Sequence, residues 1–153
     1  MATETATTQV RQGPPKFVNA LIRLLLRSPF SGGIGNVLML LEFKGRKSGK
    51  LYRLPVGYMR RGETITTFTD RNWWKNLRDQ APVTLYIKGK RLRGTAGIVQ
   101  QPNLVAEELS VLVQQHPHAA RPYGISFDAT GQPDAESVQQ AARRFTMICI
   151  RLQ

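Results

Sequence analysis

Residues 40–60 read Leu-Leu-Glu-Phe-Lys-Gly-Arg-Lys-Ser-Gly-Lys-Leu-Tyr-Arg-Leu-Pro-Val-Gly-Tyr-Met-Arg, two strand-like segments joined by a turn. Glycines begin and end the turn at residues 45–49, here named the basic turn, and allow backbone conformations closed to other residues. Cationic and hydroxyl side chains meet on its rim: Arg46, Lys47, Ser48 and Lys50. Such a rim suits an anionic ligand such as a phosphate, although a solvated hairpin turn accounts for the same residues.

The segments around this turn predict a mainly antiparallel α+β fold. Hairpin connections favour antiparallel pairing, and about six strands in a short chain would curl into a small barrel that hides their edges. The predicted strands are residues 36–44, 50–60, 63–69, 82–88, 90–99 and 145–152. Short helices are expected at about residues 73–79, 103–115 and 134–144.

The N-terminal part of the chain divides into a tail and a helix. Residues 1–12 have no apolar periodicity and predict a disordered tail, which leaves residues 13–153 as a single domain. Residues 14–27 alternate basic and apolar positions at helical spacing. This amphipathic helix either packs on the sheet or lies on a membrane surface.

The charge is strongly positive and localised. The 153-residue chain has 22 Lys and Arg against 10 Asp and Glu, a net charge of +12. Residues 44–93 hold 14 basic and 3 acidic residues, so 14 − 3 = +11 falls in that third of the chain. Such a field attracts nucleic acid, anionic lipid or a polyanionic small molecule. Nucleic acid is disfavoured because no nucleic-acid motif is present.

Cysteine usage and hydropathy indicate the compartment. Cys149 is the single cysteine, so an intramolecular disulfide is excluded and a reducing compartment fits. No apolar run has transmembrane length. We therefore expect a cytoplasmic protein, peripheral to the membrane if the helix at residues 14–27 binds lipid.

The sequence contains no recognisable set of side chains for acid–base, nucleophilic or metal-dependent catalysis. The only histidines, His116 and His118, have no metal-ligand partners at suitable spacing, so no metal site is predicted. No nucleophile elbow and no poised carboxylate pair occurs. The glycine cluster at residues 31–35 follows a helix and is not a dinucleotide fingerprint. Redox chemistry, if present, would then belong to a bound cofactor.

A second segment, residues 66–77, suits a flat ligand. A strand ending in hydroxyls enters a short helix with Trp73 and Trp74 adjacent. One tryptophan would fill the core while the other faces a groove, where a planar ring system could lie. Both rings packing in the core is the alternative.

Together these motifs resemble the deazaflavin-dependent nitroreductase family of the split β-barrel flavin-binding superfamily. The resemblance rests on Leu-Leu-x-x-x-Gly-Arg-Lys-Ser-Gly at residues 40–49, Pro-Val at 55–56 and Trp-Trp-Lys-Asn-Leu at 73–77. Ala-Pro-Val-Thr-Leu at 81–85 and Gly-Thr-Ala at 94–96 belong to the same pattern. The match covers about residues 15–100.

The resemblance implies a split barrel that binds coenzyme F420, a deazaflavin bearing a phosphate and an oligoglutamate tail. It places the phosphate on Arg46, Lys47, Ser48 and Lys50, and the ring system along Tyr52, Leu54 and Pro55. It adds Thr67, Phe68, Thr69, Trp74 and Asn76 as further contacts. FMN is the alternative cofactor, and the wider superfamily also binds haem-type ligands and lipids.

The implied activity is hydride transfer from the reduced coenzyme to an electron-poor organic acceptor such as a quinone, nitroaromatic or enone. Tyr123, in a turn-rich loop, is the candidate proton donor. The alternative function is a non-catalytic barrel that binds a flavin, a deazaflavin or a lipid. Split barrels of this type often form dimers, so the resemblance leaves both a monomer and a homodimer as alternatives.

Overall fold

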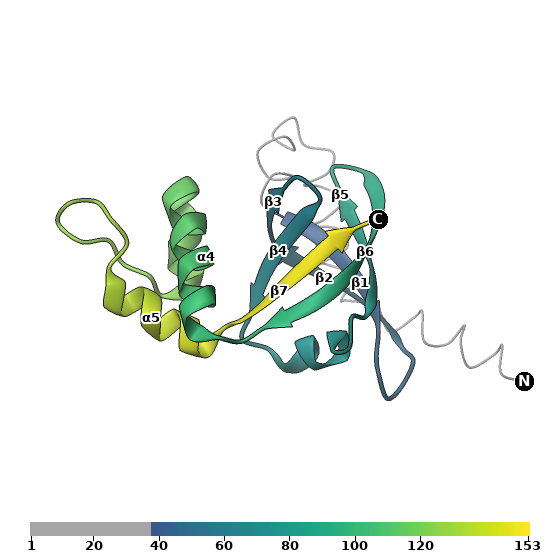
Figure 1. Cartoon of the computed structure of the whole chain (residues 1–153). Helices are drawn as coiled ribbons and strands as arrows, with labels where there is room; N and C mark the ends of the chain where they lie inside the picture. The colour runs from purple at the N-terminus through teal and green to yellow at the C-terminus, as the bar shows by residue number, and fades with distance from the viewer. Residues whose placement is uncertain (1–37) are drawn as a thin grey trace, which may run out of the picture.

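The computed structural model describes residues 38–153, and the expected tail and helix at residues 1–37 lie outside the described part. Figure 1 shows a curled sheet with two longer helices beside one end of it. The strands are β1 (Leu38–Lys44), β2 (Leu51–Gly57), β3 (Met59–Arg61), β4 (Thr64–Thr69), β5 (Pro82–Ile87), β6 (Lys90–Val99) and β7 (Thr146–Leu152). The helices are η1 (Asn72–Leu77), α4 (Pro102–Gln115), η2 (Pro117–Tyr123) and α5 (Ala135–Arg144).

The strands form one seven-stranded antiparallel sheet in the order β2-β1-β5-β6-β7-β4-β3. The edge strand β2 and the strand β4 are not ladder neighbours, yet the Thr67 hydroxyl donates a hydrogen bond of 2.6 Å to the Gly57 carbonyl oxygen. This bond joins the two sides of the curled sheet. The predicted antiparallel barrel is therefore confirmed, as a half-barrel.

The sheet has an apolar inner face and a polar outer face because side chains alternate along each strand. Along β1, Met39, Leu41 and Phe43 are buried in the barrel. The outer positions of β1 include Glu42, whose cross-strand neighbours are Arg53 on β2 and Thr84 on β5. The outer face thus carries most of the strand charge.

A second core lies between the sheet and the helices. Val105, Leu109 and Val113 of α4 are fully buried and pack with Phe68 of β4 and Met147 of β7. Figure 1 shows α4 and α5 standing beside the barrel, while η1 runs below it. Phe68 therefore points away from the barrel interior and into the helical core.

Two local details differ from expectation. The single strand expected at residues 50–60 is divided into β2 and β3 at Tyr58, which is buried. Tyr123, expected in a turn-rich loop, is the last residue of the short helix η2, which is followed by Gly124 in the left-handed conformation (φ 69°). None of the helices within residues 38–153 is long and apolar enough to cross a membrane.

Candidate functional site

The basic turn is a rigid hairpin end between β1 and β2. The Gly45 N–H donates to the Lys50 carbonyl oxygen at 2.7 Å, and the Gly49 N–H donates to the Gly45 carbonyl oxygen at 2.9 Å. Gly49 has φ +68°, a conformation that costs other residues about 1–2 kcal/mol. The Lys50 N–H donates to the Ser48 hydroxyl oxygen at 3.2 Å. The turn is closed by its own backbone.

The helix η1 fixes the turn from outside. The Asn76 side-chain oxygen accepts from the Arg46 N–H at 2.9 Å, while the Asn76 amide nitrogen donates to the Trp73 carbonyl oxygen at 2.9 Å. The Arg46 guanidinium pairs with the Asp79 carboxylate at 2.7 Å. Arg46 and Asn76, both predicted as ligand contacts, are thus brought together, and their polar groups hold the turn against η1.

These bonds leave a defined set of donors at the tip of the turn. Within residues 38–153, the Lys47 and Ser48 backbone N–H groups donate no hydrogen bond, and the Lys47 ammonium has no partner. The Ser48 hydroxyl accepts from Lys50 but retains its own proton to donate. Adjacent backbone N–H groups beside an ammonium are groups that suit an anion such as a phosphate.

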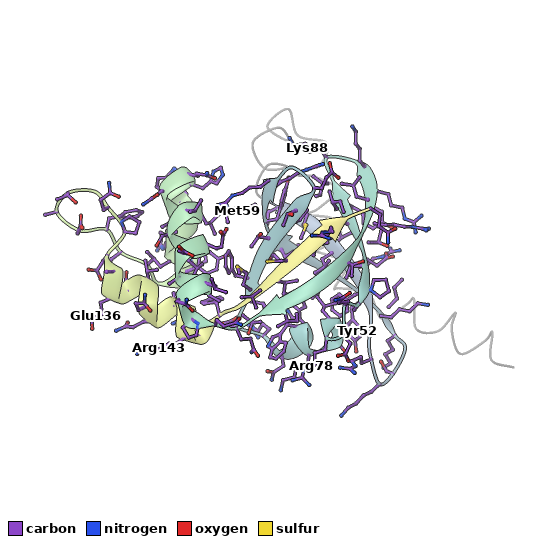
Figure 2. The ribbon with its side chains drawn as sticks, in the orientation of Figure 1. Tyr52, Met59, Arg78, Lys88, Glu136 and Arg143 are labelled. Atoms are coloured by element: carbon purple, nitrogen blue, oxygen red, sulfur yellow. The ribbon has the colours of Figure 1, made fainter. Side chains whose placement is uncertain are left out.

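An aromatic row leads from the turn toward η1. The Tyr52 ring stacks on Phe43 with centroids 5.5 Å apart and an interplanar angle of 19°. Phe43 stacks in turn on Trp73 at 5.5 Å and 24°. Tyr52 is 39% exposed, so the outer end of the row is open to a ligand. Figure 2 shows Tyr52 and Arg78 at the same lower end of the barrel as η1.

Trp74, and not Trp73, is the tryptophan predicted from the sequence to contact the ligand. The Arg78 guanidinium lies over the Trp74 ring, 5.0 Å from its centroid. Both tryptophans are partly buried against the barrel core. The sequence signal that could have pointed to Trp73 is Phe43, the last inward-facing residue of β1. An aromatic ring at that position needs a partner across the end of the barrel.

The other ring-side residues divide between the two faces of the sheet. Leu54 lies opposite Leu41 and packs against the barrel core, so it shares the inner face with Tyr52. Pro55 lies opposite Leu40 on the outer face and is exposed. The structure does not bring Pro55 together with the aromatic row.

The threonine hydroxyls at the end of β4 are buried and already engaged in hydrogen bonds within the protein. Thr67 is 1% exposed and donates its proton to Gly57, and the Thr69 hydroxyl accepts from the Arg71 N–H at 3.0 Å. Both face the barrel, while Phe68 faces the helices. Both residues shape the barrel wall. Thr67 keeps only acceptor lone pairs for a ligand, whereas Thr69 retains its hydroxyl proton to donate.

Tyr123 lies in the helical core with Phe68. Its ring makes edge contacts with Phe68 at 5.8 Å and with Phe145 at 4.9 Å. Burial raises the pKa of Tyr123 to about 12. A cavity of about 50 Å³ beside the ring is lined by Gly57, Tyr58, Thr66, Phe68, Leu112, His116 and Ala119. Tyr123 and Phe68 therefore form a region of their own, on the opposite side of β4 from Thr67.

A curled antiparallel half-barrel, with a cationic hairpin turn and an adjacent aromatic row at one end, defines a split-barrel protein. Residues 29–124 match the family model described as F420H(2)-dependent quinone reductase, well over half of the chain. The chain belongs to this family. Its cofactor is coenzyme F420, and it is an F420H2-dependent reductase. No curated protein matches the chain.

Solved structures support the fold. An F420-H2 dependent reductase (FDR-A) superposes with a TM-score of 0.52 at 15% identity, covering 74% of this chain and 93% of that one. A 5-nitroimidazole antibiotic resistance protein from Bacteroides thetaiotaomicron gives 0.53 at 10% identity, with 83% and 80% covered. HutZ, a heme storage protein from Vibrio cholerae, gives 0.51 at 10% identity, with 82% and 89% covered. At these identities the likeness shows the shared split barrel alone.

The residues of the site fit the coenzyme. The donors of the basic turn that have no partner in the described part of the chain suit its phosphate, and the exposed Tyr52 ring suits stacking against a planar deazaflavin. The contacts of each predicted residue with the coenzyme remain predictions.

Proposed function

We propose that this reductase transfers a hydride from reduced F420 to a quinone or a similar electron-poor acceptor, such as a nitroaromatic or an enone. The observation that carries the coenzyme site is the pair of N–H groups at Lys47 and Ser48, beside the Lys47 ammonium, all three without a partner among residues 38–153. The family description supports a quinone as the acceptor.

In this proposal the protein holds and orients the coenzyme. The tip of the basic turn binds the phosphate, and η1 keeps the tip in place through Asn76 and Asp79. The aromatic row of Tyr52, Phe43 and Trp73 gives the ring system a wall whose inner members are packed in the core. When bound, the reduced deazaflavin supplies the hydride.

Reduction of a quinone to a hydroquinone takes a hydride and a proton, and Tyr123 is the proposed source of the proton or of a hydrogen bond to the acceptor oxygen. Its raised pKa of about 12 keeps the phenol protonated at neutral pH but makes it a weak acid. We therefore favour hydrogen bonding to the acceptor oxygen as its main role. The adjacent cavity of about 50 Å³ has room for a water or a carbonyl end, not for a whole ring.

The test is a turnover assay. Protein, reduced F420 and menadione are mixed, and the return of the oxidised deazaflavin absorbance is followed against a protein-free control. The proposal expects many turnovers per protein. Tight coenzyme binding with no turnover on menadione, a nitroaromatic or an enone would instead favour a carrier or storage protein.

A further inference from the structure

Two neighbouring cavities share part of their walls where α4 ends. The small cavity beside Tyr123 measures about 50 Å³, and a wider one measures about 310 Å³. Tyr58 and His116 line both cavities. The rest of the wider cavity is lined by Met59, Arg60, Ile87, Lys88 and Gln115. Arg60, Lys88 and Gln115 are exposed, and Figure 2 shows Lys88 at the upper end of the barrel. The wider cavity thus lies between solvent and the wall formed by Tyr58 and His116.

His116 is the half-buried residue that joins α4 to η2. Its backbone N–H donates to the Leu112 carbonyl oxygen at 2.8 Å, and its carbonyl oxygen accepts from the Ala119 N–H at 2.8 Å. Both backbone groups are therefore engaged, and the imidazole is the polar group that His116 can present to the cavities. Within residues 38–153 this imidazole makes no hydrogen bond or ion pair.

The two cavities hold one side chain of the kind that titrates near neutral pH. Their titratable and charged wall residues are Tyr58, Arg60, Lys88, His116 and Tyr123, and no carboxylate of the described part of the chain is among them. Burial raises the pKa of Tyr58, and it raises that of Tyr123 to about 12. Arginine and lysine keep their protons at neutral pH, whereas an imidazole ordinarily exchanges its proton at about pH 6.5.

Reduction of the acceptor requires a proton that Tyr123 is poorly suited to give. The hydride carries two electrons to the acceptor and leaves a negative charge on its oxygen. The Tyr123 phenol is a weak acid that can hold this oxygen by a hydrogen bond. A water needs ~10–15 Å³, so the small cavity has space for one beside a carbonyl oxygen. Tyr58, Thr66 and His116 in its wall are polar, as such a water requires.

We propose that His116 supplies this proton, through a water in the small cavity, to the acceptor oxygen that Tyr123 holds. The inference rests on the proposed reductase activity. The imidazolium N–H bond breaks as the water takes the proton, and the water gives one of its own protons to form the O–H bond of the product. The electrons arrive with the hydride, so the acceptor is reduced and the coenzyme oxidised. The neutral imidazole regains a proton from solvent through the wider cavity.

The test compares the two histidines of the chain. His116→Gln keeps a polar side chain of similar size that cannot carry the proton. His118→Gln is the matched control, because His118 is exposed and lines neither cavity. Each full-length protein is mixed with reduced F420 and menadione, and the single-turnover rate of coenzyme oxidation is measured from about pH 5.5 to about pH 8.5. Ionisation of the coenzyme itself affects both variants alike and cancels in the ratio of their rates.

The ratio of the His118→Gln rate to the His116→Gln rate should be about tenfold near pH 5.5 and fall toward one near pH 8.5. The reason is that the relay acts only while the imidazole is protonated, and that fraction shrinks as the pH rises past about 6.5. His118→Gln should match the wild type at every pH. The Kd for F420 and the unfolding midpoint should be the same in both variants, since the relay does not hold the coenzyme or the fold.

Two results would overturn the relay. One is a ratio near one at every pH. The other is a ratio that stays constant across the pH range, because a merely structural effect of the substitution would slow the reaction without following the charge of the imidazole. Both results leave the reductase activity itself intact. If the wild type oxidises reduced F420 with no acceptor at any pH, the proposed function fails, so the two failures are distinguishable.

Discussion

Replacing Asn76 with alanine tests whether the position of the basic turn matters for the coenzyme. The substitution removes the acceptor for the Arg46 N–H and the donor to the Trp73 carbonyl, two hydrogen bonds of 2.9 Å each. A net ~0.5–1 kcal/mol for each of these partly exposed bonds gives a destabilisation of about 1–2 kcal/mol. For a chain of this size that lowers Tm by roughly 3–8 °C.

The same substitution should weaken coenzyme binding. Binding must then fix a turn that η1 no longer holds, and ordering the backbone of one residue costs about 1–2 kcal/mol. The expected rise in Kd for F420 is therefore roughly five- to thirtyfold. Thermal unfolding followed by circular dichroism and fluorescence titration of the coenzyme measure the two effects.

Asp79→Asn is the matched control. Asp79 has φ +60°, which asparagine tolerates well, and its ion pair with Arg46 is largely solvent-exposed. Loss of that pair should cost no more than ~1 kcal/mol, and loss of a carboxylate beside the phosphate should leave Kd equal or lower. Wild-type affinity in Asn76→Ala, or a larger loss in Asp79→Asn than in Asn76→Ala, would refute the reasoning.

Three further substitutions test separate parts of the account. Lys47→Ala should raise Kd for F420 by about 10- to 100-fold through loss of a charge-assisted contact. Its unfolding curve should match the wild type because Lys47 has no partner within residues 38–153. Unchanged affinity would show that the phosphate does not bind at the basic turn. Tyr123→Phe should lower kcat but not coenzyme affinity, and an unaltered kcat would exclude its role. Because burial raises the pKa of Tyr123 to about 12, the unfolded state loses its phenolic proton first, so stability should fall from about pH 10 to pH 12 in the wild type and less in Tyr123→Phe, as pH-dependent denaturant titrations would show. Gly94→Ala places a Cβ 2.6 Å from the Ile150 side chain and 2.8 Å from the Arg151 carbonyl oxygen. The free energy of unfolding, measured in urea, should therefore fall by about 1–3 kcal/mol, the amount depending on how far β7 can shift. An unchanged unfolding midpoint would contradict the close packing of β6 on β7.

The sequence predicted the sheet well because the relevant signals are local. Apolar alternation in β1, the glycines of the basic turn and the Lys88-Gly89-Lys90 hairpin each determine structure within a few residues. The break at Tyr58 was missed although Gly57 stands directly before it, because a glycine inside a strand pattern can mark a bulge or a close backbone approach as well as a strand end. It depends on the edge of the curled sheet, where β2 ends and β3 pairs with β4.

The candidate site was harder to predict because its contacts join residues that are far apart in the sequence. Arg46 meets Asp79 at a separation of 33 residues, so its engagement could not be inferred from the turn alone. The division of Thr67 and Phe68 between two cores follows from strand alternation, but which face meets the helices depends on where α4 packs. Lys47 and Ser48 differ from the rest of the turn because the amides of Gly45, Arg46, Gly49 and Lys50 already donate hydrogen bonds.

The most direct test of the central claim is a crystal structure of the protein with F420 bound. The account predicts the coenzyme phosphate within hydrogen-bond distance of the Lys47 and Ser48 N–H groups, with the deazaflavin ring beside Tyr52. A phosphate bound away from the basic turn would contradict the account, whatever the activity of the protein.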